Sequence, residues 1–302
     1  MKPRVESLPL KVSRILNRRK VLSAEEAARL MRDEKGYEGE LLFDDRVEKL
    51  SKEWLVLNDL QLESNNTNFQ IDSFLITQKP MLFEIKNHEG DYYIEGDKWY
   101  YINGDVVPNP VNQLERTESL LQRLLQDHGF NIPIEAYIIF VNPNFHLYNA
   151  PRNLPIKYPA QLNRFFNKLD KNPIKVNEYH MRLAKKLIYL HKNVSPRTIL
   201  PKYSYNDLRK GITCTHCHSF NLESKKMALF CKNCGTIENI SSAILRSVDE
   251  YTLLFPERKI TISNILDWCN GIRTRNTIRN ILLKQYTLKY NGKASYYEKT
   301  SK

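Results

Sequence analysis

The first residues with a clear chemical use lie in two apolar segments of the N-terminal half. FQIDSFLI carries Asp72, and PMLFEIKN carries Glu84 and Lys86 after a gap of eleven residues. Side chains on a β-strand alternate between its two faces, so Glu84 and Lys86 emerge on the same face. If the two segments pair as neighbouring strands, Asp72 projects beside them in a suitable register. We therefore predict two carboxylates and an ammonium at one point of a sheet.

This combination suits the metal-assisted hydrolysis of a phosphodiester. Mg²⁺ or Mn²⁺ prefers oxygen ligands and retains several waters, so Asp72 and Glu84 suffice to hold it. The metal would polarise the phosphate and lower the pKa of a bound water, while Lys86 would orient that water and stabilise charge on the phosphate. The alternative is an ordinary edge hairpin with solvated charges. Because charges inside such apolar segments are costly unless they are paired or used, we favour the metal site.

A second pattern lies in the cysteines. Four of the five form two pairs, each with a two-residue gap: Cys214, Cys217, Cys231 and Cys234. Four thiolates satisfy tetrahedral zinc, and because an all-thiolate site is closed to substrate, the spacing predicts a structural Zn²⁺ ribbon. His216 or His218 in place of one thiolate is the alternative. Cys269 is predicted to be a small buried hydrophobe.

The elements that position the first site follow from apolar periodicity. We expect helices at 25–34, 38–50 and 110–128, strands at 53–63, 69–76, 80–87 and 134–142, and an aromatic hairpin at 91–103. Pro110 is suited to the first turn of the third helix, and Gly129 to its end. The order predicts an α/β fold, with a mixed β-sheet flanked by helices.

The C-terminal half is predicted to be helical and basic. Four prolines within residues 143–160 indicate a linker or an irregular excursion after the sheet, and basic helices are expected at 160–170 and 176–193. Residues 261–285 predict two short helices, with Arg273, Arg275 and Arg279 at the start of the second. This is similar to a helix-turn-helix, whose second helix enters the major groove of DNA, and residues 286–299 suit a β-wing. A small helical domain with a basic surface explains the pattern equally well.

Charge is distributed unevenly along the chain. Residues 1–150 hold 18 Lys and Arg against 24 Asp and Glu, whereas residues 151–302 hold 28 against 10. The basic half suits a polyanion such as nucleic acid, although Lys-rich surfaces also serve solubility. With no apolar run of about 18 residues and no apolar signal segment, we expect a cytoplasmic protein without a membrane partner.

The nuclease pattern is part of a wider resemblance. GYEGE at 36–40, FQIDSFLI, MLFEIKNHEG and NPVNQ resemble the nuclease-related domain (NERD) family of the PD-(D/E)xK nuclease superfamily, over about residues 36–145. The resemblance implies a restriction-endonuclease-like core. It also implies site roles for five positions: Glu40, Asp72, Glu84, Lys86 and Gln113. In that family the glycine–glutamate pair opens the first helix, and the helix glutamine contacts substrate or supports the site.

Two of these positions have simpler explanations. Glu40 could be a first-turn carboxylate favoured by the helix dipole, and Glu38 competes with it for that place. Gln113 could cap its helix. His88, close to the motif, is predicted to be a loop residue.

We expect five segments: a helical extension (1–35), a nuclease domain (36–150), a basic helical connector (151–208), a zinc ribbon (209–238) and a basic helical or winged-helix-like domain (239–302). The predicted activity is that of a Mg²⁺-dependent endonuclease that acts on DNA rather than RNA. The alternatives are a non-catalytic DNA- or RNA-binding regulator that retains the nuclease fold, and an interaction protein whose zinc module contacts a protein partner. The sequence leaves a homo-oligomer open.

Overall fold

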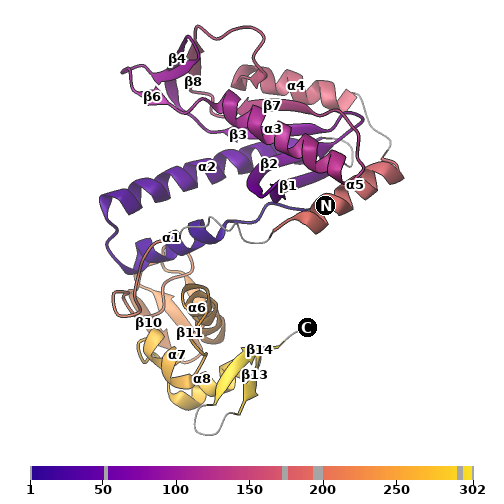
Figure 1. Ribbon diagram of the computed structural model, residues 1–302. Helices are drawn as coiled ribbons and strands as arrows, with labels where there is room; N and C mark the ends of the chain where they lie inside the picture. Colours follow the sequence, from indigo (N-terminus) through magenta and orange to yellow (C-terminus); the bar gives the residue numbers. More distant parts are fainter. Residues whose placement is uncertain (1, 51–53, 172–175, 193–199, 291–294, 301–302) are drawn as a thin grey trace. The chain divides into compact units, whose positions relative to one another are not determined.

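The computed structural model describes residues 2–50, 54–171, 176–192, 200–290 and 295–300 (Figure 1). Contacts between Cα atoms divide the chain into two compact units, Met1–Ser7 with Met31–Ile199, and Leu8–Leu30 with Leu200–Lys302. The five segments expected from the sequence remain a prediction. Within the described residues, no helix combines the length and the apolar character needed to cross a bilayer.

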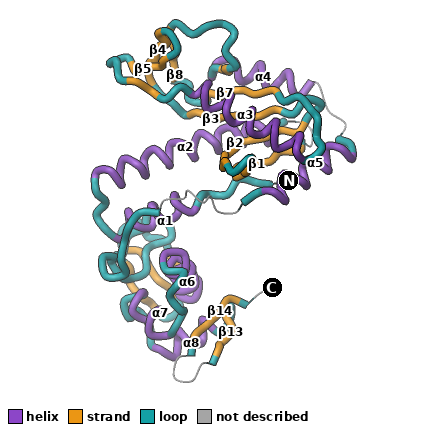
Figure 2. Tube along the Cα trace, viewed as in Figure 1, coloured by secondary structure: helices purple, strands orange, loops and turns teal. Residues whose placement is uncertain are grey.

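The first unit is built on two sheets (Figure 2). Its elements are the later part of α2 (Ala24–Glu48), β1 (Leu55–Ser64), β2 (Thr67–Ile76), β3 (Met81–Lys86), β4 (Gly90–Glu95), β5 (Lys98–Tyr101), β6 (Val106–Val107), α3 (Pro110–Asp127), β7 (Glu135–Phe140), β8 (Phe145–Tyr148), β9 (Ile156–Lys157), α4 (Pro159–Lys171) and α5 (Glu178–Leu190). The strand orders are β1-β2-β3-β7-β9 and β6-β5-β4-β8. In the larger sheet β1, β2 and β3 are antiparallel, whereas β7 runs parallel to β3 and to β9. The predicted mixed α/β fold is confirmed.

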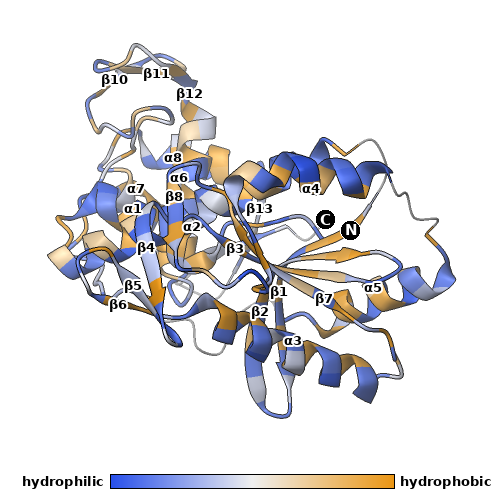
Figure 3. Ribbon diagram, turned by 90° about the horizontal axis from the view of Figure 1, so that it is seen from above, coloured by the Kyte–Doolittle hydropathy of each residue, from blue (hydrophilic) through white to orange (hydrophobic). Residues whose placement is uncertain are grey.

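Helices cover both faces of the larger sheet. Alternate strand residues point to opposite sides, so each strand contributes apolar side chains to both faces. Phe74 and Ile138 join the core that includes α3 and α5. Their chain neighbours Leu75 and Ile139 join a separate core with residues of α2 and α4. Figure 3 shows the resulting apolar character of the sheet strands. A sheet buried on both faces provides a rigid support for side chains at its edge.

Two local predictions were wrong. The helices expected at 25–34 and 38–50 are one continuous helix, α2, which passes through both Gly36 and Gly39. The proline-rich stretch at 143–160 is not a linker, because its two short strands β8 and β9 extend the two sheets. Tertiary pairing outweighs weak local propensity in both places.

The second unit gathers elements from both ends of the chain. They are α1 (Leu8–Arg19), the start of α2, β10 (Leu222–Lys225), β11 (Ala228–Cys231), β12 (Ile237–Asn239), α6 (Ile240–Leu254), α7 (Ile262–Trp268), α8 (Arg275–Leu282), β13 (Tyr286–Lys289) and β14 (Tyr296–Lys299). Arg19 is fully buried and donates to Glu250 at 2.7 and 3.0 Å and to the carbonyl of Gly211 at 3.1 Å. Its guanidinium lies 4.0 Å from the ring centroid of Trp268. Arg19 thus joins α1 to α6 and α7.

Candidate metal centres

The hairpin of β2 and β3 brings Asp72 and Glu84 to one edge of the larger sheet. Its register pairs Ser73 with Phe83, so that Asp72 and Glu84 hold the next opposed positions. The ladder ends there, and the backbone amide of Ile85 donates to Asp72 Oδ2 at 2.8 Å. The carboxylate of Asp72 therefore lies between the two strands in the place of a backbone acceptor.

Lys86 and Gln113 converge on Glu84. The Lys86 ammonium lies 2.7 Å from Glu84 Oε1 and 3.0 Å from Gln113 Oε1, and Gln113 Nε2 donates to the same Glu84 oxygen at 2.6 Å. Gln113 reaches this point from the first turn of α3, which Asn109 caps and Pro110 begins. These three side chains, predicted from separate segments, form one hydrogen-bonded group.

Glu40 comes from the middle of α2, which corrects the expectation that it opens a helix. The preceding Gly39 is buried, and a Cβ added to it would lie 2.5 Å from Asn87 Cβ and 3.3 Å from Val141 Cγ2. Only glycine lets α2 pass so close to the segments that follow β3 and β7. The glycine therefore positions Glu40 at the edge where β3 ends.

Two residues of this centre were missed from the sequence. Arg4 donates to Glu40 Oε2 at 2.8 Å, to both carboxylate oxygens of Asp44 at 2.8 and 3.1 Å, and to the carbonyl of Asp72 at 3.0 Å. Asp44 had a weak signal, since it follows Glu40 by four residues on the same helix. Arg4 had none, because its partners are distant in the sequence and no motif includes it.

The carboxylates of this centre carry more negative charge than Arg4 and Lys86 offset. Burial, and after it the charge of Asp72, raises the pKa of Glu84 to about 7. The same two causes raise the pKa of Glu40 to about 7, although Arg4 acts in the opposite direction. Burial also raises the pKa of Asp72 despite the nearby cations. A hard divalent cation among these oxygens would favour their ionised forms, so the donor set fits Mg²⁺ or Mn²⁺.

A groove adjoins this centre. It has a volume of about 370 Å³ and is lined by Asn68, Phe69, Gln70, Asn112, Gln113, Arg116, Thr117 and Leu120. Its polar lining, among the described residues, consists of carboxamides, a hydroxyl and one guanidinium, the kinds of group that contact phosphate and sugar oxygens. Gln113, which also bonds to Glu84, is the residue that the groove shares with the centre.

The predicted cysteine cluster is confirmed in the second unit. The four sulfurs of Cys214, Cys217, Cys231 and Cys234 lie within 4.8 Å of one another, with contacts of 3.5 and 3.6 Å. Zinc–sulfur bonds of about 2.3 Å imply sulfur separations of roughly 3.8 Å in a tetrahedron, so the cluster fits a structural Zn²⁺. Gly235 at φ 75° permits the final turn of the knuckle. In the described residues the cluster includes neither His216 nor His218.

Helices α6, α7 and α8 are followed by the antiparallel hairpin β13–β14, and Tyr297 of that hairpin forms a bridge with Ile260. This order is common to both interpretations of the sequence, a helix-turn-helix with a wing and a small helical domain with a basic surface. Arg275 and Arg279 are exposed on α8, whereas Arg273 donates to the carbonyls of Lys225 and Lys226 in the β10–β11 turn, at 2.9 Å each. Arg273 therefore ties the cysteine module to the start of α8.

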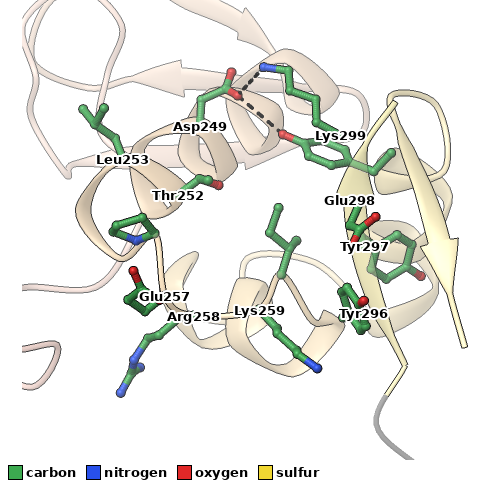
Figure 4. Close-up of a pocket in the computed structure, with 13 residues that line it drawn as sticks. Asp249, Thr252, Leu253, Glu257, Arg258, Lys259, Tyr296, Tyr297, Glu298 and Lys299 are labelled. Carbon is green, nitrogen blue, oxygen red and sulfur yellow. Dashed lines mark hydrogen bonds and ion pairs between the residues drawn. The ribbon is translucent and has the colours of Figure 1, made fainter. Parts of the chain in front are cut away.

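A cavity of about 490 Å³ lies between α6 and the hairpin (Figure 4). Charges of both signs line it, and Asp249 accepts from Lys299 and Tyr286. Because three acidic and three basic side chains line it, and Asp249 pairs directly with Lys299, the cavity offers no concentrated field of one sign for a charged ligand.

Comparison with known families supports the first centre. The family model for the nuclease-related domain (NERD) matches residues 35–141, roughly a third of the chain. The matched range contains Glu40, Asp72, Glu84, Lys86 and Gln113, but not Arg4 or the cysteines. No curated protein and no solved structure matches the chain. The chain thus combines a segment that matches the nuclease-related domain model with a four-cysteine cluster that fits zinc.

Proposed function

We propose that the protein is a metal-dependent nuclease that hydrolyses phosphodiester bonds in DNA, with Mg²⁺ as the physiological ion. The observation that carries this proposal is the convergence of Lys86 and Gln113 on one oxygen of Glu84, beside Asp72. Asp72 and Glu84 would hold the ion through carboxylate oxygens. When bound, the ion supplies Lewis-acid polarisation of the phosphate and a water of lowered pKa.

The remaining side chains act on substrate and water. Lys86, held by Glu84 and Gln113, presents a fixed ammonium that orients the attacking water and stabilises charge developing on the phosphate. Gln113 and Arg116, which both line the neighbouring groove, would bind the nucleic-acid strand. Glu40 supports the centre through its bond to Arg4.

The second unit is proposed to deliver this domain to DNA. Arg275 and Arg279 would contact DNA from α8, with the zinc-held ribbon fixed beside that helix through Arg273. Residues 151–302 carry 28 basic against 10 acidic side chains, which supports attraction to a polyanion.

Plasmid cleavage tests the proposal. Purified protein is incubated with supercoiled plasmid and Mg²⁺, as wild type and as Lys86→Met, Asp72→Asn and Lys98→Met. Lys98 is an exposed lysine of β5 and serves as the matched control. We expect cleavage to fall at least about 100-fold in the first two variants and to stay unchanged in the third.

Other outcomes would contradict the enzyme. If no divalent ion supports cleavage but the protein retains DNA in a salt-sensitive manner, the chain is a binding regulator that keeps the nuclease fold. If DNA is neither cut nor retained, contact with a protein partner through the zinc module becomes the better hypothesis.

A further inference from the structure

A short N-terminal segment is built into the candidate nuclease centre from outside the matched domain. Lys2 forms a parallel bridge with Leu57 of β1, and its ammonium donates to the carbonyls of Asn58 and Asp59 at 2.8 Å each. These bonds fix the segment along the edge of β1. Arg4, two residues on, is thereby held against the carboxylates of α2.

The Arg4 guanidinium has its donors committed inside this centre. Its Nε and Nη2 bind Asp44 as a two-pronged pair, Nη1 binds Glu40, and Nη2 also reaches the carbonyl of Asp72. Its side chain is 3% exposed. Asp44 is held further by Asn58, at 3.2 Å. A planar guanidinium fixed in this way is a permanent charge with one orientation.

A charge count shows what this cation does. The connected acidic and basic groups of the centre are Glu40, Asp44, Asp72 and Glu84 against Arg4 and Lys86. Four carboxylates against two cations leave a formal excess of two negative charges. Lys2 and Asp59, the next charged pair along this edge, offset one another. One divalent ion therefore neutralises the centre, whereas two would leave it positive.

We propose that Arg4 is a resident cation of the nuclease centre, which holds Glu40 outside the coordination shell of the metal and takes the place of a second divalent ion. The inference rests on the proposed function. In it Arg4 is a positioning residue, Glu40 is not a metal ligand, and the centre binds a single ion.

Manganese binding tests this without reference to activity. Zinc-loaded full-length protein is titrated with Mn²⁺, and free Mn²⁺ is followed by its electron paramagnetic resonance signal. The variants are Arg4→Gln, Arg4→Lys and Glu40→Gln, with Arg46→Gln as the matched control. Arg46 lies on the same helix α2, where it is half-buried and donates to Asn163 Oδ1 at 2.8 Å. Asp72→Asn serves to abolish the centre itself.

We expect one Mn²⁺ in wild type, in Arg4→Lys and in Arg46→Gln, and two in Arg4→Gln, whose Glu40 is released. Glu40→Gln, an isosteric change, should still bind one ion with affinity within about threefold of wild type. This variant keeps the inference testable if Arg4→Gln fails to fold.

Two Mn²⁺ in wild type, one in folded Arg4→Gln, or a loss of more than about tenfold in affinity for Glu40→Gln overturns the role of Arg4 while leaving a metal centre. Absence of Mn²⁺ binding to wild type, or binding unchanged by Asp72→Asn, overturns the proposed function and this inference with it.

Discussion

Gly36 and Gly39 lie one helical turn apart in α2, and replacing each by alanine should have opposite effects on stability. A Cβ at Gly36 meets nothing within 4 Å, whereas a Cβ at Gly39 would lie 2.5 Å from Asn87 Cβ. Both substitutions gain about 0.5–1 kcal/mol of helix propensity, since alanine loses less backbone entropy than glycine. Only Gly39→Ala adds a contact that is shorter than van der Waals separation by about 1 Å.

The difference between the two variants therefore isolates the clash. Asn87 Cβ is anchored to the backbone and cannot move aside like the end of a flexible side chain, so we expect a difference of about 1–3 kcal/mol, toward the upper end. Urea unfolding followed by circular dichroism measures it, and amide exchange in β3 and β7 assigns the change to this unit. If Gly39→Ala proves as stable as Gly36→Ala, the close approach of α2 that positions Glu40 is refuted.

Three further predictions concern pH, zinc and a buried ion pair. Burial lowers the pKa of His88 to about 4; because the unfolded residue takes up a proton near pH 6.5 and the folded one does not, the contribution of His88 to stability should fall by about 3 kcal/mol as pH drops from about 6.5 to 4. Glu40 and Glu84, whose raised pKa values act in the opposite direction, are the same in His88→Phe, so the stability of wild type relative to that variant should fall by this amount, and an identical pH dependence in both proteins would contradict the assignment. Elemental analysis should find one zinc per chain, lost in Cys231→Ser together with amide protection of β10–β12, and zinc retained by that variant would rule out the four-sulfur site. Arg19→Met leaves Glu250 buried without its partner and should destabilise the second unit by about 3–5 kcal/mol in thermal unfolding, so that a loss below about 1 kcal/mol would contradict its role as a clamp.

Most of the elements around the candidate nuclease centre could be predicted because their signals are local. Alternating apolar residues and short turns predicted the β2–β3 hairpin, and the two-residue side-chain period was enough to align Glu84 with Lys86. Pro110 at the start of α3 placed Gln113 in its first turn. Such regular local patterns predict strands and helix starts without reference to contacts with distant segments.

The other features depend on contacts between distant segments. Gly36 and Gly39 lower the intrinsic propensity of α2, so the sequence suggested a break, and only packing against the segments after β3 and β7 keeps the helix continuous. Strands β8 and β9 span four and two residues. Such short runs carry no periodicity, and parallel pairing with β4 and β7 defines them.

The matched domain is therefore smaller than the physical unit that supports its site. Residues 35–141 contain the five predicted site positions, yet they lack Arg4, which bonds to Glu40, and also α4 and α5, which cover opposite faces of the sheet. A fragment limited to that range would expose apolar side chains such as Ile138 and Ile139 and would leave Glu40 without its fixed cation. Because both losses arise far from the motif in sequence, the candidate nuclease centre is a property of the whole first unit, the N-terminal segment included.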